Sequence, residues 1–324
     1  MKRTTYISLS ALASVLVLLT FWRCRQDEED FRPYPNTLTA VDQVIRQVPD
    51  PSIYTAFKLY GAIPDTVLNT GSGMQIQLID AENLFADKNG APVPCSTCDE
   101  VVIELTEIRK KGDMVAYRLH TAGDDGSLLD AVAVVEFRAS CDGKPLTLLH
   151  DRNVLLRLPV SGASLTEAYR AVFPDADSTV FKWNLPGEPA FFAEWPVQST
   201  LLKGYELVLN QTGRVACARL LDAPSVSTFC VQLDAPPYNN QNTRMYLVFE
   251  GANSVVELHT VPGTNHFCYD FAPLGYPVQV VSLSNTNSGF ELGNYKTEIG
   301  TNSETPLDPV IVSEQELIDF LRAL

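Results

Sequence analysis

The chain has 324 residues, 45% hydrophobic and 19% charged, a composition that suits a globular protein with one or two sizeable cores. Asp and Glu number 39 against 24 Lys and Arg, so the formal net charge is −15. A surface this acidic repels phosphate backbones and argues against nucleic-acid binding. Proline (21) and glycine (18) are spread along the chain, which excludes collagen-like and fully disordered structures.

Residues 1–24 have the order of a signal peptide. Basic residues 2–3 precede an apolar run over residues 7–22, and an acidic run over residues 27–30 follows. The apolar run is about 16 residues long, short for a membrane span of roughly 20. Cys24 resembles the acylated first residue of a bacterial lipoprotein, and the acidic run resembles the surface-export signal of Bacteroidota lipoproteins. This resemblance implies an outer-membrane or cell-surface lipoprotein anchored through Cys24. The alternatives are an uncleaved N-terminal anchor, a periplasmic-facing protein and simple secretion.

Residues 25–67 are predicted to form a linker that contains one short helix. Apolar residues recur at helical spacing between residues 37 and 48, and Asn36 or Thr37 is suited to cap this helix.

Residues 68–160 change to the two-residue period of β-strands. Turn signals lie at residues 87–90, 123–126 and 141–144. The strands are predicted at residues 74–78, 101–108, 114–119, 129–137 and 154–160. Short strands separated by such turns indicate an all-β protein, with an antiparallel β-sandwich in this region.

Residues 161–204 are predicted to connect two β-domains. The segment is rich in aromatic residues and interrupted by prolines, with Trp183 and Trp195 as its largest side chains. Clustered aromatic rings usually pack in a core, so we expect these two to be buried on a sandwich face and to stabilise the junction. The alternative is an exposed aromatic platform for a glycan or a peptide.

Residues 205–305 contain a second series of predicted strands, at 205–209, 215–220, 228–233, 244–249, 255–260, 267–271 and 278–283. This number of strands in about 90 residues is typical of an immunoglobulin-like sandwich. In residues 306–324, Ser313 and Glu316 form a capping box ahead of apolar residues at helical spacing, which predicts a C-terminal helix.

The first β series resembles a ZU5-like sandwich of uncharacterised exported Bacteroidota proteins. The matching features are Gly73, the hairpin sequence over residues 87–93, the strand after it and the Lys-x-Asp-Met sequence over residues 111–114. A family strand with the sequence Trp-Ile-Asn-Cys-Asp-Arg-Phe is matched at Cys217 and Arg219. The resemblance implies a modular cell-envelope protein with an adhesive or scaffold role, without implying any catalytic chemistry.

Six cysteines remain once Cys24 is set aside, and an even number in an exported chain favours disulfides. They are Cys95, Cys98, Cys141, Cys217, Cys230 and Cys268. Three fall in each predicted half, so each half would keep one thiol or one disulfide would join the halves. Cys95 and Cys98 have the C-x-x-C spacing. We expect at least one of them in a structural disulfide, with its neighbour or with Cys141; zinc and a thioredoxin-like redox motif are the alternatives.

Few residues point to chemistry. The four histidines form no metalloprotease string, and the sequence contains no G-x-S-x-G, Walker A or G-x-G-x-x-G motif. His259 and His266 flank a predicted turn and, with Asp270, form a possible metal set, although surface histidines are more common. The acidic turns at residues 87–90 and 123–126 could contribute to calcium sites but are better interpreted as hairpin turns. No cofactor or metal is predicted.

Two short strings resemble the Asp-Ser/Thr-apolar sites at which Bacteroidota O-glycosylate exported proteins. They place Thr66 and Ser178 as acceptors, in segments predicted to be connectors.

The sequence therefore predicts a non-enzymatic cell-envelope lipoprotein that acts in binding, adhesion or assembly. Its partners would be envelope proteins or surface glycans, and the membrane through the N-terminal anchor. The alternatives are an exported carbohydrate-active or hydrolytic accessory protein, marked by an aromatic row beside paired carboxylates, and a structural subunit of an outer-membrane complex, marked by a large apolar patch.

Overall fold

The computed structural model describes residues 39–123, 125–160, 165–174, 182–223, 225–233, 238–301 and 303–324. The predicted signal segment with Cys24, and the predicted acceptor Ser178, lie outside these residues. Within the described ranges, no helix combines the length and the apolar character that a bilayer span requires.

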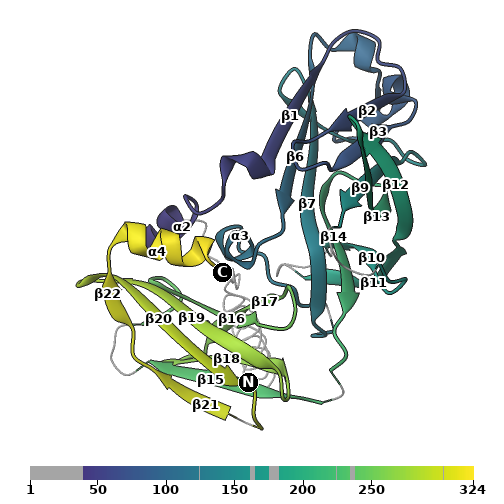
Figure 1. The fold of residues 1–324 in the computed structure, drawn as a ribbon. Coiled ribbons are helices and arrows are strands. Elements are labelled where there is room, and N and C mark those ends of the chain that lie inside the picture. The colour runs from purple at the N-terminus through teal and green to yellow at the C-terminus, as the bar shows by residue number, and fades with distance from the viewer. Residues whose placement is uncertain are drawn as a thin grey trace, which may run out of the picture. The chain divides into compact units, whose positions relative to one another are not determined.

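The first β-sandwich consists of two antiparallel sheets (Figure 1). The strands of its larger sheet pair in the order β1 (Tyr54–Leu59), β6 (Val101–Ile108), β7 (Leu129–Cys141), β14 (Gly213–Leu220), β10 (Arg170–Pro174) and β11 (Trp183–Pro189). The end of β7 also pairs with β8 (Lys144–Leu148), and β8 is followed in the sheet by β4 (Phe85–Ala86) and β5 (Pro92–Val93). The smaller sheet has the order β12 (Phe191–Val197), β13 (Thr200–Leu209), β9 (Val154–Pro159), β3 (Gln75–Leu78) and β2 (Thr66–Asn69).

Alternate residues of these strands fill the core between the two sheets. β9 buries Val154, Leu156 and Leu158, while the residues between them face outward and are half-buried. Because successive side chains of a strand point to opposite faces, this period of two places one apolar row against Leu105 and Phe137 of the facing sheet. The alternation seen in the sequence is thus the pattern of a sandwich strand.

The second β-sandwich follows along the chain. One layer consists of β15 (Val226–Leu233), β18 (His266–Pro273) and β21 (Ser303–Leu307), and the other of β16 (Thr243–Phe249), β17 (Val255–Thr260), β19 (Pro277–Thr286), β20 (Gly289–Glu298) and β22 (Val310–Val312). The β17–β18 hairpin joins the layers, and β15–β21 is a parallel pair. Phe229, Leu247 and Phe267 belong to the core that this sandwich encloses.

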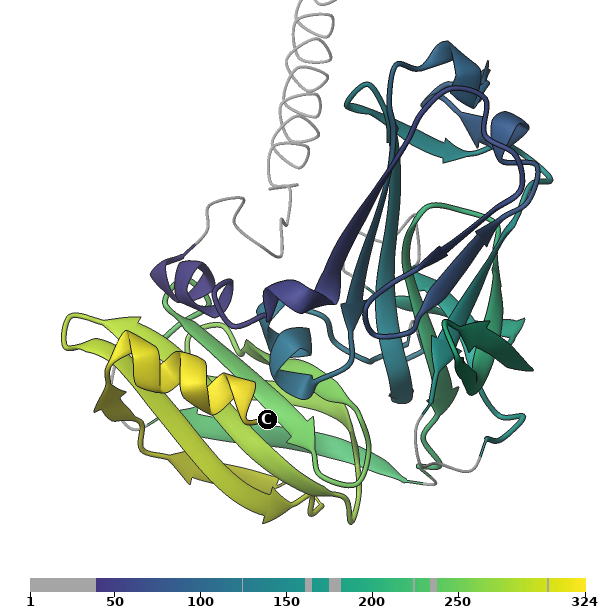
Figure 2. The same ribbon diagram turned by 45° about the horizontal axis from the view of Figure 1, so that its top comes forward.

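Three short helices cover the outer face of β16 and β19. They are α2 (Ala40–Ile45), α3 (Lys111–Ala116) and α4 (Glu314–Arg322), with the 3₁₀ turns η1 (Pro51–Ile53), η2 (Ala81–Asn83) and η3 (Cys95–Thr97) elsewhere. Figure 2 shows the three helices close together beside the sheet of the second sandwich. Their apolar side chains join residues of β7, β14, β16 and β19 in one buried cluster, which we call the junction core. As a result, all seven residues of β16 are buried.

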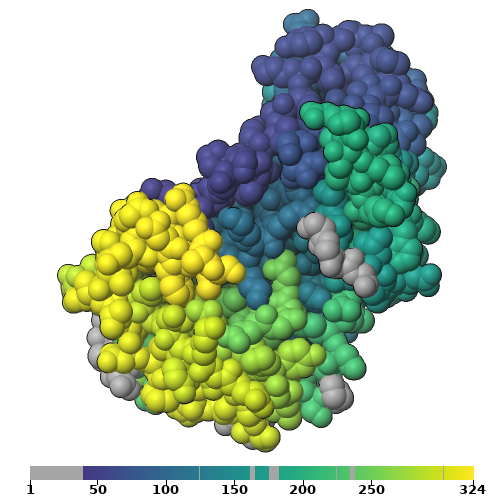
Figure 3. All heavy atoms as spheres, viewed as in Figure 1, coloured from purple at the N-terminus to yellow at the C-terminus, as the bar shows by residue number. Residues whose placement is uncertain are grey.

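The two ends of the described chain meet in this helical layer. Arg322 Nε donates to the carbonyl oxygen of Val48 at 2.9 Å, and Gln47 Nε2 donates to Glu314 Oε1 at 2.7 Å. Figure 3 shows the yellow C-terminal residues next to the purple residues of the N-terminal helix. The predicted C-terminal helix is present as α4, and its capping box at Ser313 and Glu316 is formed. The predicted N-terminal helix is present as α2, but its cap is Thr39 and not Asn36 or Thr37, because Thr39 forms a capping box with Asp42.

The strand predicted over residues 114–119 is instead the helix α3. Its buried residues Met114 and Val115 contact the junction core, a contact that the local pattern does not reveal. Gly112 allows α3 and α4 to approach, because a Cβ atom at this position would lie 1.8 Å from the carbonyl oxygen of Leu321. The helix is therefore selected by tertiary packing.

The predicted all-β class with antiparallel sandwiches is confirmed, but strand pairing moves the predicted boundaries. β13 and β14, predicted in the second domain, pair with β9 and β7 of the first sandwich. The predicted connector contributes β10, β11 and β12 to the same sandwich, and β1 and β2 extend it into the predicted linker. Pairing between distant strands, rather than the order of strands along the chain, decides these memberships.

Candidate functional site

The two connector tryptophans do not form an exposed platform. Trp183 is 0% and Trp195 1% exposed. Trp183 packs in the junction core and its Nε1 donates to the carbonyl oxygen of His120 at 2.8 Å. Trp195 Nε1 donates to the carbonyl oxygen of Gly73 at 3.1 Å, within the first sandwich. The platform alternative is wrong because both rings are buried and each indole N–H donates to a backbone carbonyl in the interior.

Four of the six body cysteines form two disulfides, Cys98–Cys141 and Cys230–Cys268. Cys230 and Cys268 are direct partners on β15 and β18. Cys95 and Cys217 are buried thiols. Sequence order places Cys217 in the second predicted half, but it lies on β14 of the first sandwich. The first sandwich therefore holds four of the six body cysteines and the second holds two.

The C-x-x-C spacing does not produce a redox or zinc site here. Cys98 is bonded to Cys141, and the thiol of Cys95 points to the carbonyl oxygen of Ala81 at 3.1 Å. Burial raises the pKa of Cys95 to about 11 and that of Cys217 to about 12. Both thiols therefore stay protonated near neutral pH, whereas a redox-active cysteine must form a thiolate.

Thiol labelling of the unfolded, unreduced protein should modify two body cysteines, Cys95 and Cys217, in addition to any Cys24 without lipid. The reduced protein, which should label at all six body positions, serves as the control. Mass spectrometry of the labelled peptides checks the assignment, and label on Cys98 or Cys230 before reduction would contradict the pairing.

Two other residues singled out from the sequence lie at defined positions in the first sandwich. Thr66 lies at the start of the edge strand β2, not in a connector, and its hydroxyl donates to the carbonyl oxygen of Pro64 at 2.8 Å. Asp87 forms the β4–β5 turn, because its Oδ1 accepts from the amides of Asn89 and Ala91. These bonds lower the pKa of Asp87 and form the hairpin turn that the sequence favours at residues 87–90.

An arginine-lined pocket lies between the helical layer and the larger sheet of the first sandwich, and this pocket is the candidate functional site. It has a volume of about 550 Å³. Arg46, Arg118, Arg138 and Arg214 line it, together with the rings of Tyr54 and Tyr117. We call it the arginine pocket. These four side chains come from the end of α2, the end of α3, β7 and β14.

Strand register builds the floor of the arginine pocket. Tyr54 on β1 pairs with Thr106 on β6, Thr106 pairs with Glu136 on β7, and Glu136 pairs with Arg214 on β14. Directly paired residues project from the same face of an antiparallel sheet, so these side chains form one row across four strands. Arg138 lies two residues beyond Glu136 and shares this face.

The same face of β7 changes character along its length. Val134 packs in the junction core under the helices, whereas Glu136 and Arg138, the next two residues on that face, are increasingly exposed. The arginine pocket begins where the helices stop covering the sheet.

Arg118 enters the pocket because of its backbone conformation. It follows α3 with φ at 51°, a left-handed conformation that commonly terminates a helix. Its amide donates to the carbonyl oxygen of Val115 at 3.0 Å and closes the last turn. Its Nη2 lies 3.5 Å from Oε1 of Glu257 on β17.

The carboxylates around the pocket already have partners. Glu136 Oε1 lies 2.6 Å from Arg138 Nη2 and 3.8 Å from Arg214 Nε. Asp50 accepts from the amide of Ser52 at 2.8 Å, which lowers the pKa of Asp50.

The side chain of Arg46 is exposed, and within the described ranges it forms no hydrogen bond or ion pair.

A buried ion pair fixes the inner wall of the pocket. Arg244 on β16 donates through Nε and Nη2 to the two carboxylate oxygens of Asp42 at 3.1 and 2.9 Å, and both side chains are 3% exposed. Burial alone would raise the pKa of Asp42, but the hydrogen bonds and charge of Arg244 outweigh it and lower that pKa. Arg244 Nε also lies 4.0 Å from Glu257 Oε1. This network ties α2 to the second sandwich.

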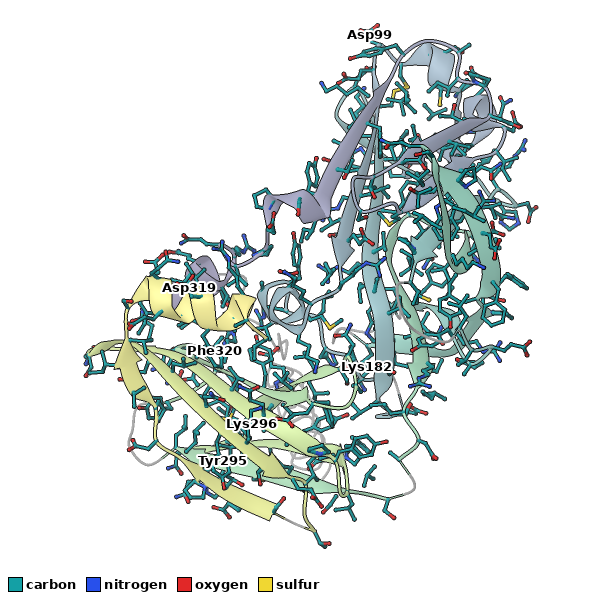
Figure 4. All side chains as sticks on the ribbon, viewed as in Figure 1. Asp99, Lys182, Tyr295, Lys296, Asp319 and Phe320 are labelled. Atoms are coloured by element: carbon teal, nitrogen blue, oxygen red, sulfur yellow. A yellow bond between two sulfur atoms is a disulfide. The ribbon has the colours of Figure 1, made fainter. Side chains whose placement is uncertain are left out.

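A second pocket, of about 580 Å³, lies over the β17–β18 hairpin. His120, Lys182, His259 and Asp270 line it, and Lys182 is labelled in Figure 4. His266 instead lies 3.3 Å from Glu304. Among the described residues, the one group of three potential ligands with closely spaced atoms contains the disulfide-bonded Cys98 and Cys141, so the histidines do not form the metal set considered from the sequence.

The sequence reasoning missed the four arginines. Glu136 and Arg138 carry a weak signal, since they alternate with apolar residues near the end of a mostly apolar strand. Nothing local marks Arg46, Arg118 or Arg214, because they meet only through the fold.

Comparison of the chain with protein-family models, with curated proteins and with solved structures gives no match.

Proposed function

We propose that this protein is a non-enzymatic binding module displayed by the cell envelope, with the arginine pocket as its ligand site. The observation that carries the proposal is the concentration of positive side chains in that pocket. Four of the chain's 24 Lys and Arg residues line one cavity of a protein with net charge −15. The size of the cavity is in the range of small-molecule sites.

The architecture supports binding through a preformed site. The walls of the arginine pocket come from the first sandwich and from the segments around α2 and α3. The junction core and the Asp42–Arg244 pair hold these helices on the second sandwich. A site whose walls are fixed before binding loses less conformational entropy when the ligand arrives.

The two disulfides support a location outside the cytosol. Disulfides persist in oxidising compartments. Cys98–Cys141 joins the end of η3 to β7 in the first sandwich, and Cys230–Cys268 joins β15 to β18 in the second. This agrees with the lipoprotein-like leader and with residence at the outer membrane or cell surface, where envelope proteins or surface glycans would be the partners.

The carbohydrate-active alternative is less favoured. An exposed aromatic row beside paired carboxylates would favour it, but the two tryptophans considered for such a row are buried. A binding role at the arginine pocket needs no such row.

The anchoring part of the proposal is tested by Cys24→Ser. We expect this variant to leave the membrane fraction or to remain unprocessed, because acyl chains contribute about 0.8 kcal/mol per buried methylene. Fractionation and the mass of the N-terminal peptide check the result, with Cys217→Ser as a matched control. Membrane partition and N-terminal mass equal to those of the wild type would reject lipid attachment.

A further inference from the structure

We propose that the arginine pocket binds an oxyanion, a carboxylate or a phosphate, carried on a polar ligand of sugar size. The inference rests on the proposed function, because it names the ligand class of the same site. Three lines of observation lead to it: the charge of the lining, the arrangement of the arginines and the rings beside them.

The charge of the lining selects an anion. Four arginines face three carboxylates, those of Asp42, Asp50 and Glu136. Each of these carboxylates is already bound, Asp42 by Arg244, Asp50 by the amide of Ser52 and Glu136 by Arg138. Asp42 is neutralised by Arg244 and Arg118 by Glu257, both of which lie outside the lining. Arg46, Arg138 and Arg214 then face only Asp50 and Glu136, so the lining keeps an excess of positive charge.

The arginines approach the pocket from different directions. Arg46 ends α2, Arg118 follows α3, and Arg138 and Arg214 rise from adjacent strands of the sheet. A guanidinium group has five N–H donors in a rigid fork, so one or two hydrogen bonds to a neighbour leave further donors. Such forks match the paired oxygens of a carboxylate or phosphate.

The rings and the volume favour a ligand larger than a bare ion. Tyr54 is 49% exposed beside the pocket, and Tyr117 lines it from the end of α3. Burial raises the pKa of Tyr117, so this ring remains uncharged near neutral pH. Pro49 and Pro51 add apolar surface to the lining. A polar ring can lie against these surfaces while its anionic group meets the arginines.

The test measures binding by isothermal titration calorimetry of the full-length protein in detergent. The probes are digalacturonate, glucose 6-phosphate and the neutral disaccharide galactobiose. We expect at least one charged probe to bind and galactobiose not to bind. Binding should weaken as salt is raised, because ions screen an attraction between charges at an open site. The tighter of the two charged probes identifies the anion.

Arg46→Gln and Arg214→Gln are each expected to weaken binding of the charged probe by about tenfold or more, the effect of losing a charged hydrogen bond. Arg46 is suitable because it is exposed at the end of α2. Arg152→Gln is the matched control, since Arg152 pairs with Asp80 at 2.8 Å outside the pocket. Thermal melts of all variants verify folding.

The proposal is overturned if neither charged probe binds, if galactobiose binds equally well, or if Arg152→Gln weakens binding as much as the pocket variants do. Its failure is distinguishable from failure of the envelope role. If the protein fractionates with membranes but binds no probe, the envelope role stands and the anionic ligand is rejected. If the protein binds a charged probe but does not fractionate with membranes, the ligand stands and the envelope role is rejected.

Discussion

Replacing Asp42 by alanine is expected to lower the free energy of unfolding by about 3–5 kcal/mol, because the change leaves the Arg244 guanidinium buried without its counter-charge. This is a large part of the roughly 5–15 kcal/mol that keeps a domain folded. Both side chains are 3% exposed and joined by two hydrogen bonds, so water cannot replace the lost partner cheaply. Denaturant unfolding monitored by circular dichroism measures the change.

Two controls separate this effect from a general loss of charge. Glu194→Ala removes an ion pair with Lys203 whose side chains are more than half exposed, and it should change stability by less than about 1 kcal/mol. The double variant Asp42→Leu with Arg244→Met should recover much of the loss, since it removes both buried charges. A loss in Asp42→Ala no larger than in Glu194→Ala would contradict the buried pair.

The ion pair also gives a pH dependence. The fold lowers the pKa of Asp42, so its contribution is fully present above the unfolded pKa of about 4 and is lost as the pH falls through the lower folded-state pKa. The stability advantage of the wild type over Asp42→Ala should therefore shrink under acidic conditions and remain constant near neutral pH.

Replacing Trp183 by alanine is expected to cost about 3–5 kcal/mol and to lower the melting temperature by several degrees, because a fully buried indole leaves a cavity. The ring packs in the junction core, where residues of both sandwiches meet, and the variant also leaves the carbonyl oxygen of His120 without its indole donor. A thermal melt measures the effect.

Phe191→Ala is the matched control for Trp183. Phe191 comes from the same aromatic segment but is 53% exposed, so its removal should change stability by about 0.5 kcal/mol or less. If Trp183→Ala melts like the wild type and Phe191→Ala does not, the assignment of buried and exposed rings is wrong.

The periodicity of apolar residues predicted most helices and strands correctly where one face of the element is buried and the other is exposed to solvent. β6 and β9 coincide closely with the predicted strands, because their alternation reflects a single sandwich core. The pattern failed at α3, whose short apolar run has no clear period and whose helical state depends on contact with α4. The local pattern also assigned β13 and β14 to the wrong sandwich. It identifies a segment as a strand but does not specify the strand with which that segment pairs.

The cysteines show the same division. Their even number predicted disulfides, and Cys141 was among the expected partners of Cys98. Cys95 remained a thiol because η3 directs it to the carbonyl oxygen of Ala81, a direction that spacing alone does not specify. For Trp183 and Trp195, the sequence left a buried and an exposed position open. Their burial in the tertiary structure makes them structural residues.

By itself, the sequence determined the all-β class, the turns and the capped C-terminal helix, because each depends on residues within a few positions of one another. Only the tertiary structure decided the arginine pocket. Its inner wall depends on Asp42 and Arg244, 202 positions apart, and its floor on the register of four strands. Local side-chain patterns encode which face of an element is buried, but the convergence of charges from separate elements exists only after those faces have packed.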